Sequence, residues 1–165
     1  MSTLSPDQNL KFFIDDAAIT VFDTMLAIDL QPSDRGARFK PGVSQVVGTV
    51  GIAGSVTAVL CLRVTESFAC HAATGMLGIE PGEAVLESDV NDAIGELANI
   101  MAGKLKSCLR TPGRPCSLSL PAIMRGYSID LESMSGTERH SFTFYHGGEP
   151  VVVEFYSLNQ KENML

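Results

Sequence analysis

The chain has 165 residues, which is enough for one domain with a substantial core and too few for two full-sized domains. Its composition, 45% hydrophobic and 19% charged, is that of a globular protein that needs neither disulfides nor a metal to fold. The net charge of −7 disfavours nucleic acid and anionic membranes as partners, because their phosphates would be repelled. We expect no secretory signal and no transmembrane segment, since the longest uncharged stretch, residues 41–62, is rich in glycine and hydroxyl side chains.

The first long helix is predicted over residues 9–30, because apolar side chains recur there at helical spacing and Pro32 follows. The apolar positions of this helix are Ile14, Ala18, Val21, Met25 and Ile28. A polar loop is expected over residues 33–43. Residues 43–64 are rich in Val and Thr and are divided by Gly51 and Gly54, which predicts two strands joined by a tight turn.

A short helix is predicted over residues 66–77, followed by a turn at 79–82 and a second long helix. We expect Ser88 to cap this second helix, with Asp89 in its first turn and the helix end near Leu109. A helical projection gathers its apolar residues in one stripe. The stripe consists of Val90, Ile94, Leu97, Met101, Leu105 and Cys108.

The last third of the chain is predicted to be extended, over residues 116–120 and 123–131, and then to form a hairpin. In the hairpin, Phe142 and Phe144 alternate with polar residues, residues 146–148 supply a Gly-Gly turn, and apolar residues return on one face. Residues 160–165 are expected to be frayed. This element order predicts an α+β fold with an antiparallel-type sheet and two long helices packed on it.

The four cysteines fit neither a redox motif nor a zinc-finger spacing, because they lie eight or nine residues apart within each pair. They are Cys61, Cys70, Cys108 and Cys116. We therefore expect reduced, mostly buried thiols, a cytoplasmic protein and no metal site.

An internal repeat is suggested by the alignment of residues 16–25 with residues 92–101, which pairs Asp, Ala and Met residues 76 positions apart. Because strands follow each copy, the single domain of residues 1–165 would consist of two related halves, at about 9–78 and 86–159. Two amphipathic helices can also agree by chance, so both interpretations remain open at this point.

A narrow polar stripe runs along the second long helix opposite its apolar stripe and consists of Asp92, Glu96, Asn99 and Gly103. Such residues can simply decorate a solvated helix. However, Asn and Gly are both unfavourable inside a helix, and Gly95 adds another glycine on or beside the same surface. This choice of residues indicates a close approach by a partner molecule.

The motif Asp92-x3-Glu96-x2-Asn99, followed by Pro121 and Gly126, resembles the signature of the CheC/CheX/FliY family of bacterial chemotaxis phosphatases. The resemblance runs over most of the chain. It implies a pseudo-symmetric, two-half CheC-like fold, in which Pro121 and Gly126 belong to the structural motif. It also implies that the substrate is a CheY-type response regulator phosphorylated on an aspartate, and that the Mg²⁺ belongs to the regulator, with no cofactor of the chain's own.

The first copy of the motif has Thr20 and Asp23 at the matching positions, so it lacks the amide and is not expected to be catalytic. One competent site resembles CheX more than CheC, and CheX-like proteins imply a homodimer. Asn99 can orient the attacking water through its amide, whereas a carboxylate such as Asp23 would repel the phosphoryl oxygens. The resemblance gives Glu96 the role of pairing with the regulator's lysine.

The glycines Gly95 and Gly103 are expected to let the partner's backbone approach the helix, beside Asp92. The exposed stripe fits a second function equally well, that of a non-catalytic adaptor or scaffold that binds a phosphorylated regulator or a flagellar-switch component. Turnover of a phosphorylated regulator would separate the two functions, because an adaptor protects the phosphoryl group and an enzyme releases it.

Overall fold

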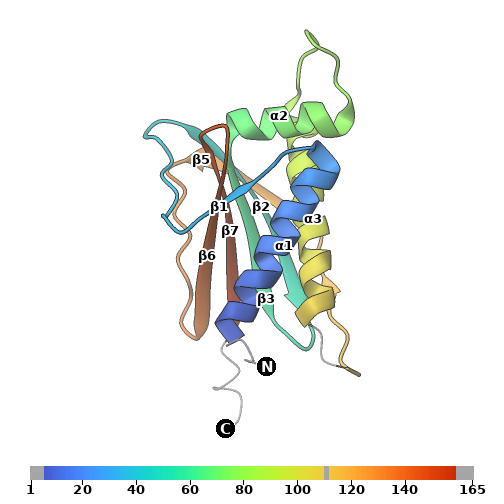
Figure 1. Ribbon diagram of the computed structural model, residues 1–165, viewed down its shortest axis with the longest axis vertical. Helices are drawn as coiled ribbons and strands as arrows, with labels where there is room; N and C mark the ends of the chain where they lie inside the picture. The colour runs from blue at the N-terminus through green and yellow to red at the C-terminus, as the bar shows by residue number, and fades with distance from the viewer. Residues whose placement is uncertain (1–5, 110–111, 159–165) are drawn as a thin grey trace.

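The computed structural model describes residues 6–109 and 112–158, and within these ranges the chain forms one antiparallel sheet and three helices (Figure 1). The elements are, in chain order, α1 (Pro6–Leu26), β1 (Gln31–Ser33), β2 (Ser44–Ala53), β3 (Ala58–Thr65), α2 (Glu66–Leu77), α3 (Glu87–Leu109), β4 (Ser117–Leu118), β5 (Ala122–Tyr127), β6 (Thr137–His146) and β7 (Glu149–Leu158). The predicted α+β class, with an antiparallel sheet and long helices on it, is confirmed. None of the described helices is long and apolar enough to cross a membrane.

The sheet is built from strands that the two halves of the chain exchange. Its strand order is β1-β6-β7-β3-β2-β4, with β5 also paired to β2. The β2–β3 and β6–β7 hairpins meet at the central β3–β7 pair. The strand that follows α1 pairs with the hairpin of the second half, and the strand that follows α3 pairs with the hairpin of the first half. Because each half supplies an edge strand to the other, the two halves share one sheet.

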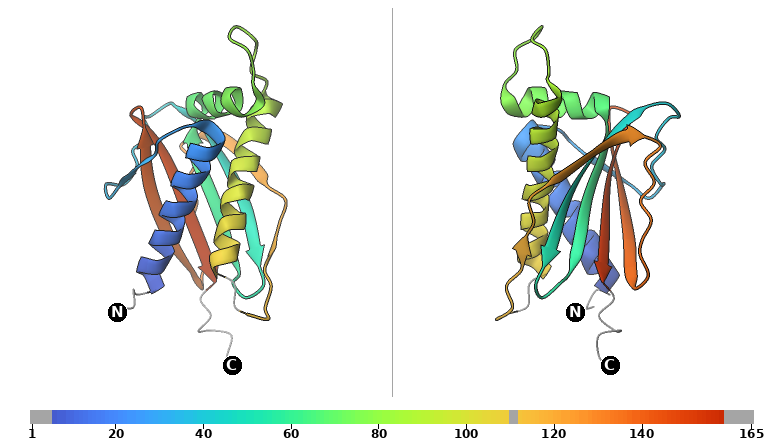
Figure 2. Two further views of the ribbon diagram at one scale, coloured as in Figure 1. Left: turned by 45° about the vertical axis from the view of Figure 1, so that its right-hand side comes forward. Right: turned by 180° about the vertical axis from the view of Figure 1, so that it is seen from behind.

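The core lies between one face of the sheet and the helices. The long helices α1 and α3 lie side by side on this face, and α2 crosses one end of it (Figures 1 and 2). Alternate residues of each central strand face the helices, as the two-residue period of a strand requires. The most buried of these strand residues are Val46, Val50, Leu60, Leu62, Val64, Val151 and Val153, all fully buried.

Gly48 lets α3 lie close to the sheet. A β-carbon added at this position would lie 3.0 Å from Ile94 Cγ2 and 3.2 Å from the Ile94 carbonyl oxygen. A side chain there would push the helix outward. The glycine therefore sets the height of α3 above β2.

The first helix ends at Leu26, four residues before the predicted end. Ala27 adopts a left-handed conformation with φ of 52°, and its N–H donates to the Asp23 carbonyl over 2.9 Å, which is a recognised helix termination. The strand β1 begins at Gln31 and was not predicted, because three residues are too few for a periodic pattern. Met25 is exposed, contrary to its predicted place in the apolar stripe, whereas Phe22, which the prediction left out of that stripe, is fully buried.

The predictions for the middle of the chain hold in outline. The two strands β2 and β3 are confirmed, with Gly54 in the turn and Gly51 inside β2, and α2 has the predicted bounds. The helix α3 begins at Glu87, so Ser88 is not its cap; instead Asp89 Oδ2 accepts a hydrogen bond from the Leu86 N–H over 2.8 Å.

The C-terminal hairpin is also confirmed, with Gly147 and Gly148 at φ of 55° and 79° in its turn. The two predicted extended segments are shorter than expected, as β4 and β5. Residues 160–165 lie outside the described residues. All four cysteines are free thiols, and Cys61 and Cys116 are buried. Cys108 is exposed, so the prediction that it belongs to the apolar stripe is wrong.

Candidate functional site

The helix α3 presents the predicted polar stripe on the side opposite the core. Asp92 and Glu96 are exposed, and Asn99 and Gly103 are half-buried. The predicted apolar stripe faces inward, and its members Val90, Ile94, Leu97, Met101 and Leu105 are all at most 2% exposed. Glu96 and Asn99 are three residues apart and therefore neighbours on one helix face.

The side chains of Asp92, Glu96 and Asn99 make no hydrogen bond or ion pair with the residues that the structure describes. A carboxylate and an amide that leave their hydrogen-bonding capacity to solvent are available to a partner molecule. Gly103 extends this open surface, because a β-carbon added there would meet no atom within 4 Å.

Gly95 does not lie on the open surface, so the prediction that it lets a partner's backbone approach is wrong. It is buried, and a β-carbon added at Gly95 would lie 3.4 Å from Pro121 Cβ. One residue is about 100° of rotation around a helix, which turns Gly95 away from the Glu96 side and toward β5. Gly95 therefore lets the chain's own segment at Pro121 pack against α3.

A β-bulge between β4 and β5 forms the sheet edge beside this helix. Leu118 pairs with Ile52, and the next residue, Ser119, donates its N–H to the Gly51 carbonyl over 2.9 Å. Pairing resumes where Ala122 faces Thr49. Two residues, Leu120 and Pro121, therefore stand opposite Val50 alone. Bulges of this kind re-aim side chains and occur often beside functional sites.

The bulge turns its two residues in different directions. Pro121 packs against Gly95 of α3, and proline suits this position because a bulge at a sheet edge does not need its missing N–H. Leu120 is 89% exposed, more than any other large apolar side chain among the described residues. Gly126, the other residue of the sequence motif, lies farther along β5 and packs near Ile129, since a β-carbon there would be 3.5 Å from Ile129 Cγ1.

Arg125 fixes the first turns of α3 to the neighbouring elements. Its guanidinium donates to Asn91 Oδ1 over 2.7 Å and to the Glu87 carbonyl over 3.2 Å, both on α3. It also forms an ion pair with Glu66 of α2 over 3.1 Å. These contacts join β5, α2 and α3 at one end of the polar stripe. Arg125 was not predicted from the sequence. Its position two residues after Ile123, on the same face of the strand, could have indicated a charged side chain that needs partners inside the fold.

The corresponding residues of the first half lie on α1. Thr20 is half-buried and Asp23 is exposed. They lie on a different helix from Glu96 and Asn99. They present a hydroxyl and a carboxylate, and neither side chain carries an amide.

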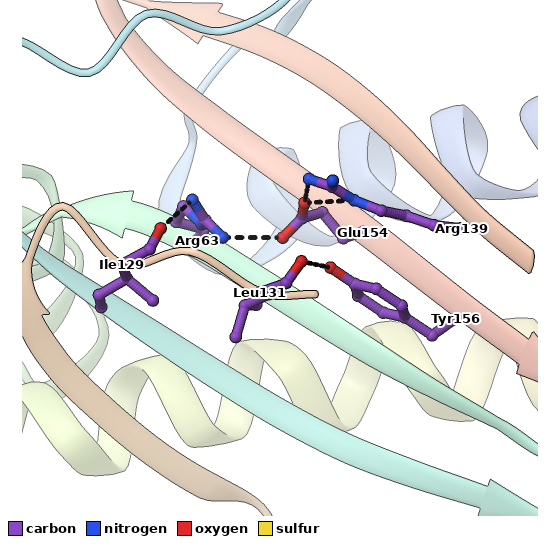
Figure 3. A network of polar contacts seen from close by, with 6 residues as sticks. All are labelled: Arg63, Ile129, Leu131, Arg139, Glu154 and Tyr156. Atoms are coloured by element: carbon purple, nitrogen blue, oxygen red, sulfur yellow. Dashed lines mark hydrogen bonds and ion pairs between the residues drawn. The ribbon is translucent and has the colours of Figure 1, made fainter. Parts of the chain in front are cut away.

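A second polar cluster, on the opposite face of the sheet, was not predicted (Figure 3). The Glu154 carboxylate is 1% exposed and is held by the guanidinium groups of Arg63, over 3.1 Å, and Arg139. Arg63 also donates to the Ile129 carbonyl over 2.9 Å, and Tyr156 donates to the Leu131 carbonyl over 3.2 Å.

This second cluster holds the segment of residues 128–136 against the sheet, and its members satisfy one another. Burial, reinforced by the Glu154 carboxylate, raises the pKa of Tyr156 and of Cys61 to about 12 each, so both stay protonated at neutral pH. The two arginines neutralise the Glu154 carboxylate, and the Cys61 thiol and the Tyr156 hydroxyl keep their protons. The cluster therefore offers no free acid or base. In the part of the chain that the structure describes, no group of three or more His, Cys, Asp or Glu residues could hold a metal ion.

Comparison with known proteins places this chain in a family. Residues 46–145 match the family model described as chemotaxis phosphatase CheX. The chain is similar to the crystal structure of a chemotaxis protein CheX from Desulfovibrio desulfuricans, at 21% identity and a TM-score of 0.74 over 90% of this chain and 98% of that one. A putative chemotaxis protein from Desulfovibrio vulgaris Hildenborough gives 25% identity and a TM-score of 0.74 over 93% and 99%.

A third similar structure is a complex of CheX with CheY, BeF₃ and Mg²⁺ from Borrelia burgdorferi. It has 22% identity and a TM-score of 0.68 over 90% of this chain and 97% of that one. A search of the curated proteins found no match. The structures share the predicted CheC-like fold with this chain.

Proposed function

The chain belongs to the CheX family of chemotaxis phosphatases, and from this premise we propose that it is a protein aspartyl-phosphate phosphatase. Its substrate is a phosphorylated CheY-type response regulator. The family match and the similarity to a protein solved together with CheY support this partner. The reaction is attack of water on phosphorus with cleavage of the bond to the aspartyl oxygen, which yields aspartate and inorganic phosphate.

Asn99 is the residue that we assign to the attacking water. Phosphoryl transfer leaves little covalent chemistry to the protein, so the available contribution is to hold the nucleophile in line with the leaving oxygen. An amide provides an acceptor and donors without carrying charge. Asn99 is half-buried on the outer side of α3, and its amide makes no hydrogen bond with the described residues, so the amide is available to hold a water.

Glu96 is assigned to binding. Its carboxylate lies one helical turn from Asn99, is exposed and has no ion-pair partner among the described residues. A lysine in the regulator's active site can supply that partner, and the resulting pair would set the register of α3 on the regulator. Asp92 and Gly103 extend the same contact surface in the two directions along the helix.

One observation carries this proposal: a carboxylate and an amide stand unpartnered on the outer face of α3 at the spacing of the family motif. The metal and the lysine of the reaction are assigned to the regulator, and the chain is proposed to need no cofactor of its own. The first half takes no part in the chemistry, because Thr20 and Asp23 provide no amide.

The proposal includes a homodimer in the cytoplasm. The strand β1 pairs with only three residues of β6. Most of β6 therefore has no neighbouring strand on that side among the described residues. Open edges favour association with another strand. Free thiols at all four cysteines are typical of a reducing compartment. Sedimentation at micromolar concentration checks the dimer, and a 17.6 kDa species would contradict it.

The experiment is phosphate release from a phosphorylated CheY-type regulator with the protein at one-tenth or less of the regulator concentration. Several turnovers per chain are expected. Protection of the phosphoryl group in proportion to added protein would contradict the enzyme and would favour the adaptor or scaffold function instead.

A further inference from the structure

The apolar side chain of Leu120 stands beside the candidate site, in water. It is 89% exposed although the sequence places it between a serine and a proline that both make specific contacts. Single exposed leucines are common on protein surfaces, so exposure alone carries no conclusion. What distinguishes Leu120 is the backbone that presents it.

The bulge fixes Leu120 on both sides. On one side, the Ser119 hydroxyl oxygen accepts the Gly51 N–H over 2.8 Å, and the hydroxyl donates to the Leu120 carbonyl over 2.9 Å. On the other side, Pro121 is wedged against Gly95 of α3. Leu120 is therefore held outward by a constrained backbone, and little conformational freedom remains to be lost on binding.

The same bulge places Leu120 next to the polar stripe. Pro121 packs against Gly95, and Asn99 lies one turn after Gly95 as its neighbour on the helix surface. Leu120, the residue before Pro121, therefore projects from the sheet edge that flanks the Asn99 side of α3. A docking partner that covers Asn99 closely enough to share a water with it also covers this edge of the sheet.

We propose that Leu120 is the apolar anchor by which the chain docks on its phosphorylated response regulator, a role that rests on the proposed function. An exposed charge pair such as the one assigned to Glu96 adds a modest, salt-dependent share of the affinity, whereas burial of a large apolar side chain at an interface adds a larger one. Leu120 supplies most of the affinity for the regulator, Glu96 adds its charge pair, and Asn99 orients the attacking water. Burial of a leucine corresponds to an affinity gain of about 10- to 100-fold.

The test compares Leu120→Ala and Leu120→Asp with Met134→Ala. Met134 is a matched control, because it is 80% exposed but lies in the segment 128–136 on the opposite face of the sheet. We expect KM for the phosphorylated regulator to rise about 10-fold in Leu120→Ala and more in Leu120→Asp, with kcat at saturation within about 2-fold of wild type. Met134→Ala should behave as wild type. A wild-type KM in Leu120→Asp, or a loss confined to kcat, would overturn the proposal.

A binding measurement separates this inference from the proposed function. The dissociation constant for a regulator loaded with beryllofluoride and Mg²⁺ is measured for the same variants, which requires no turnover. If the wild-type chain binds but does not release phosphate, the phosphatase proposal fails while a weaker affinity of the Leu120 variants still supports the anchor. Sedimentation of each variant completes the test. Dissociation of a dimer in Leu120→Asp with unchanged regulator affinity would assign Leu120 to contact between copies and overturn the proposal.

Discussion

Arg125 of β5 donates a hydrogen bond to Asn91 of α3 over 2.7 Å, five residues before Glu96. We expect Arg125→Met to lower the free energy of unfolding by about 2 kcal/mol, because partners of a charged hydrogen-bond donor are left unsatisfied. Phosphatase turnover should fall as well, since the start of α3 loses its link to β5 and α2. Urea denaturation and phosphate release measure both effects. Arg125→Lys should restore stability only in part, and Arg38→Met, at an exposed loop position, is the control.

Asn99→Ala should abolish most turnover without loss of stability. Alanine is the better helix former, so the free energy of unfolding should stay constant or rise slightly. Turnover should fall by about two orders of magnitude or more, because nothing holds the attacking water, while affinity for the phosphorylated regulator persists. Single-turnover phosphate release and a direct binding assay give the two quantities. Wild-type turnover in this variant would contradict the assignment of the water to Asn99.

Glu96→Ala should weaken binding and turnover together. The pair between Glu96 and the regulator's lysine is expected in the bound ground state as well as in the transition state, so its loss affects both. Raising the salt concentration should reduce the affinity of wild type more than that of the variant, because salt screens the charge pair. A variant that loses kcat but keeps wild-type affinity and the same salt dependence would show that Glu96 acts in the chemical step.

The variants Thr20→Ala and Asp23→Ala should leave turnover within about 2-fold of wild type. Their positions on α1 match Glu96 and Asn99 on α3, which makes them controls for the general effect of altering an exposed helix face. Phosphate release is measured in parallel with the α3 variants. Near-complete loss of activity in Asp23→Ala would place the active site on the other half of the repeat.

Stability should fall in alkaline solution. Cys61 and Tyr156 have ordinary pKa values of 9.0 and 10.0, and burial raises each to about 12 in the folded chain. Above about pH 9 the unfolded chain therefore releases protons that the folded chain retains, so the free energy of unfolding decreases as pH rises toward 12. Each group contributes up to about 1.4 kcal/mol per pH unit. Urea titrations from pH 7 to 11 should show a shallower decrease in Cys61→Ala and in Tyr156→Phe; an unchanged slope would refute the assignment.

Periodic patterns in the sequence predicted the elements that carry the site, and contacts across the fold determined the rest. The apolar spacing of α3 was enough to place Glu96 and Asn99 outside, and the Gly-Gly turn was enough to locate the last hairpin. The burial of Gly95 could not be foreseen, because it depends on Pro121, which is distant in sequence. The bulge at Leu120 was missed for the same reason, since it exists only in register with β2.

The exchange of edge strands makes the site a joint product of both halves. The residues that we propose to act on the regulator come from α3, yet the bulge beside them takes its register from β2, in the half that lacks the amide. A chain cleaved within residues 79–86 would yield two fragments, each with a hairpin that lacks its outer neighbour. Such fragments should be inactive alone and should recover activity when mixed. The first half therefore matters to the site for a reason separate from chemistry: its strand β2 sets the register of β4 and β5 beside α3.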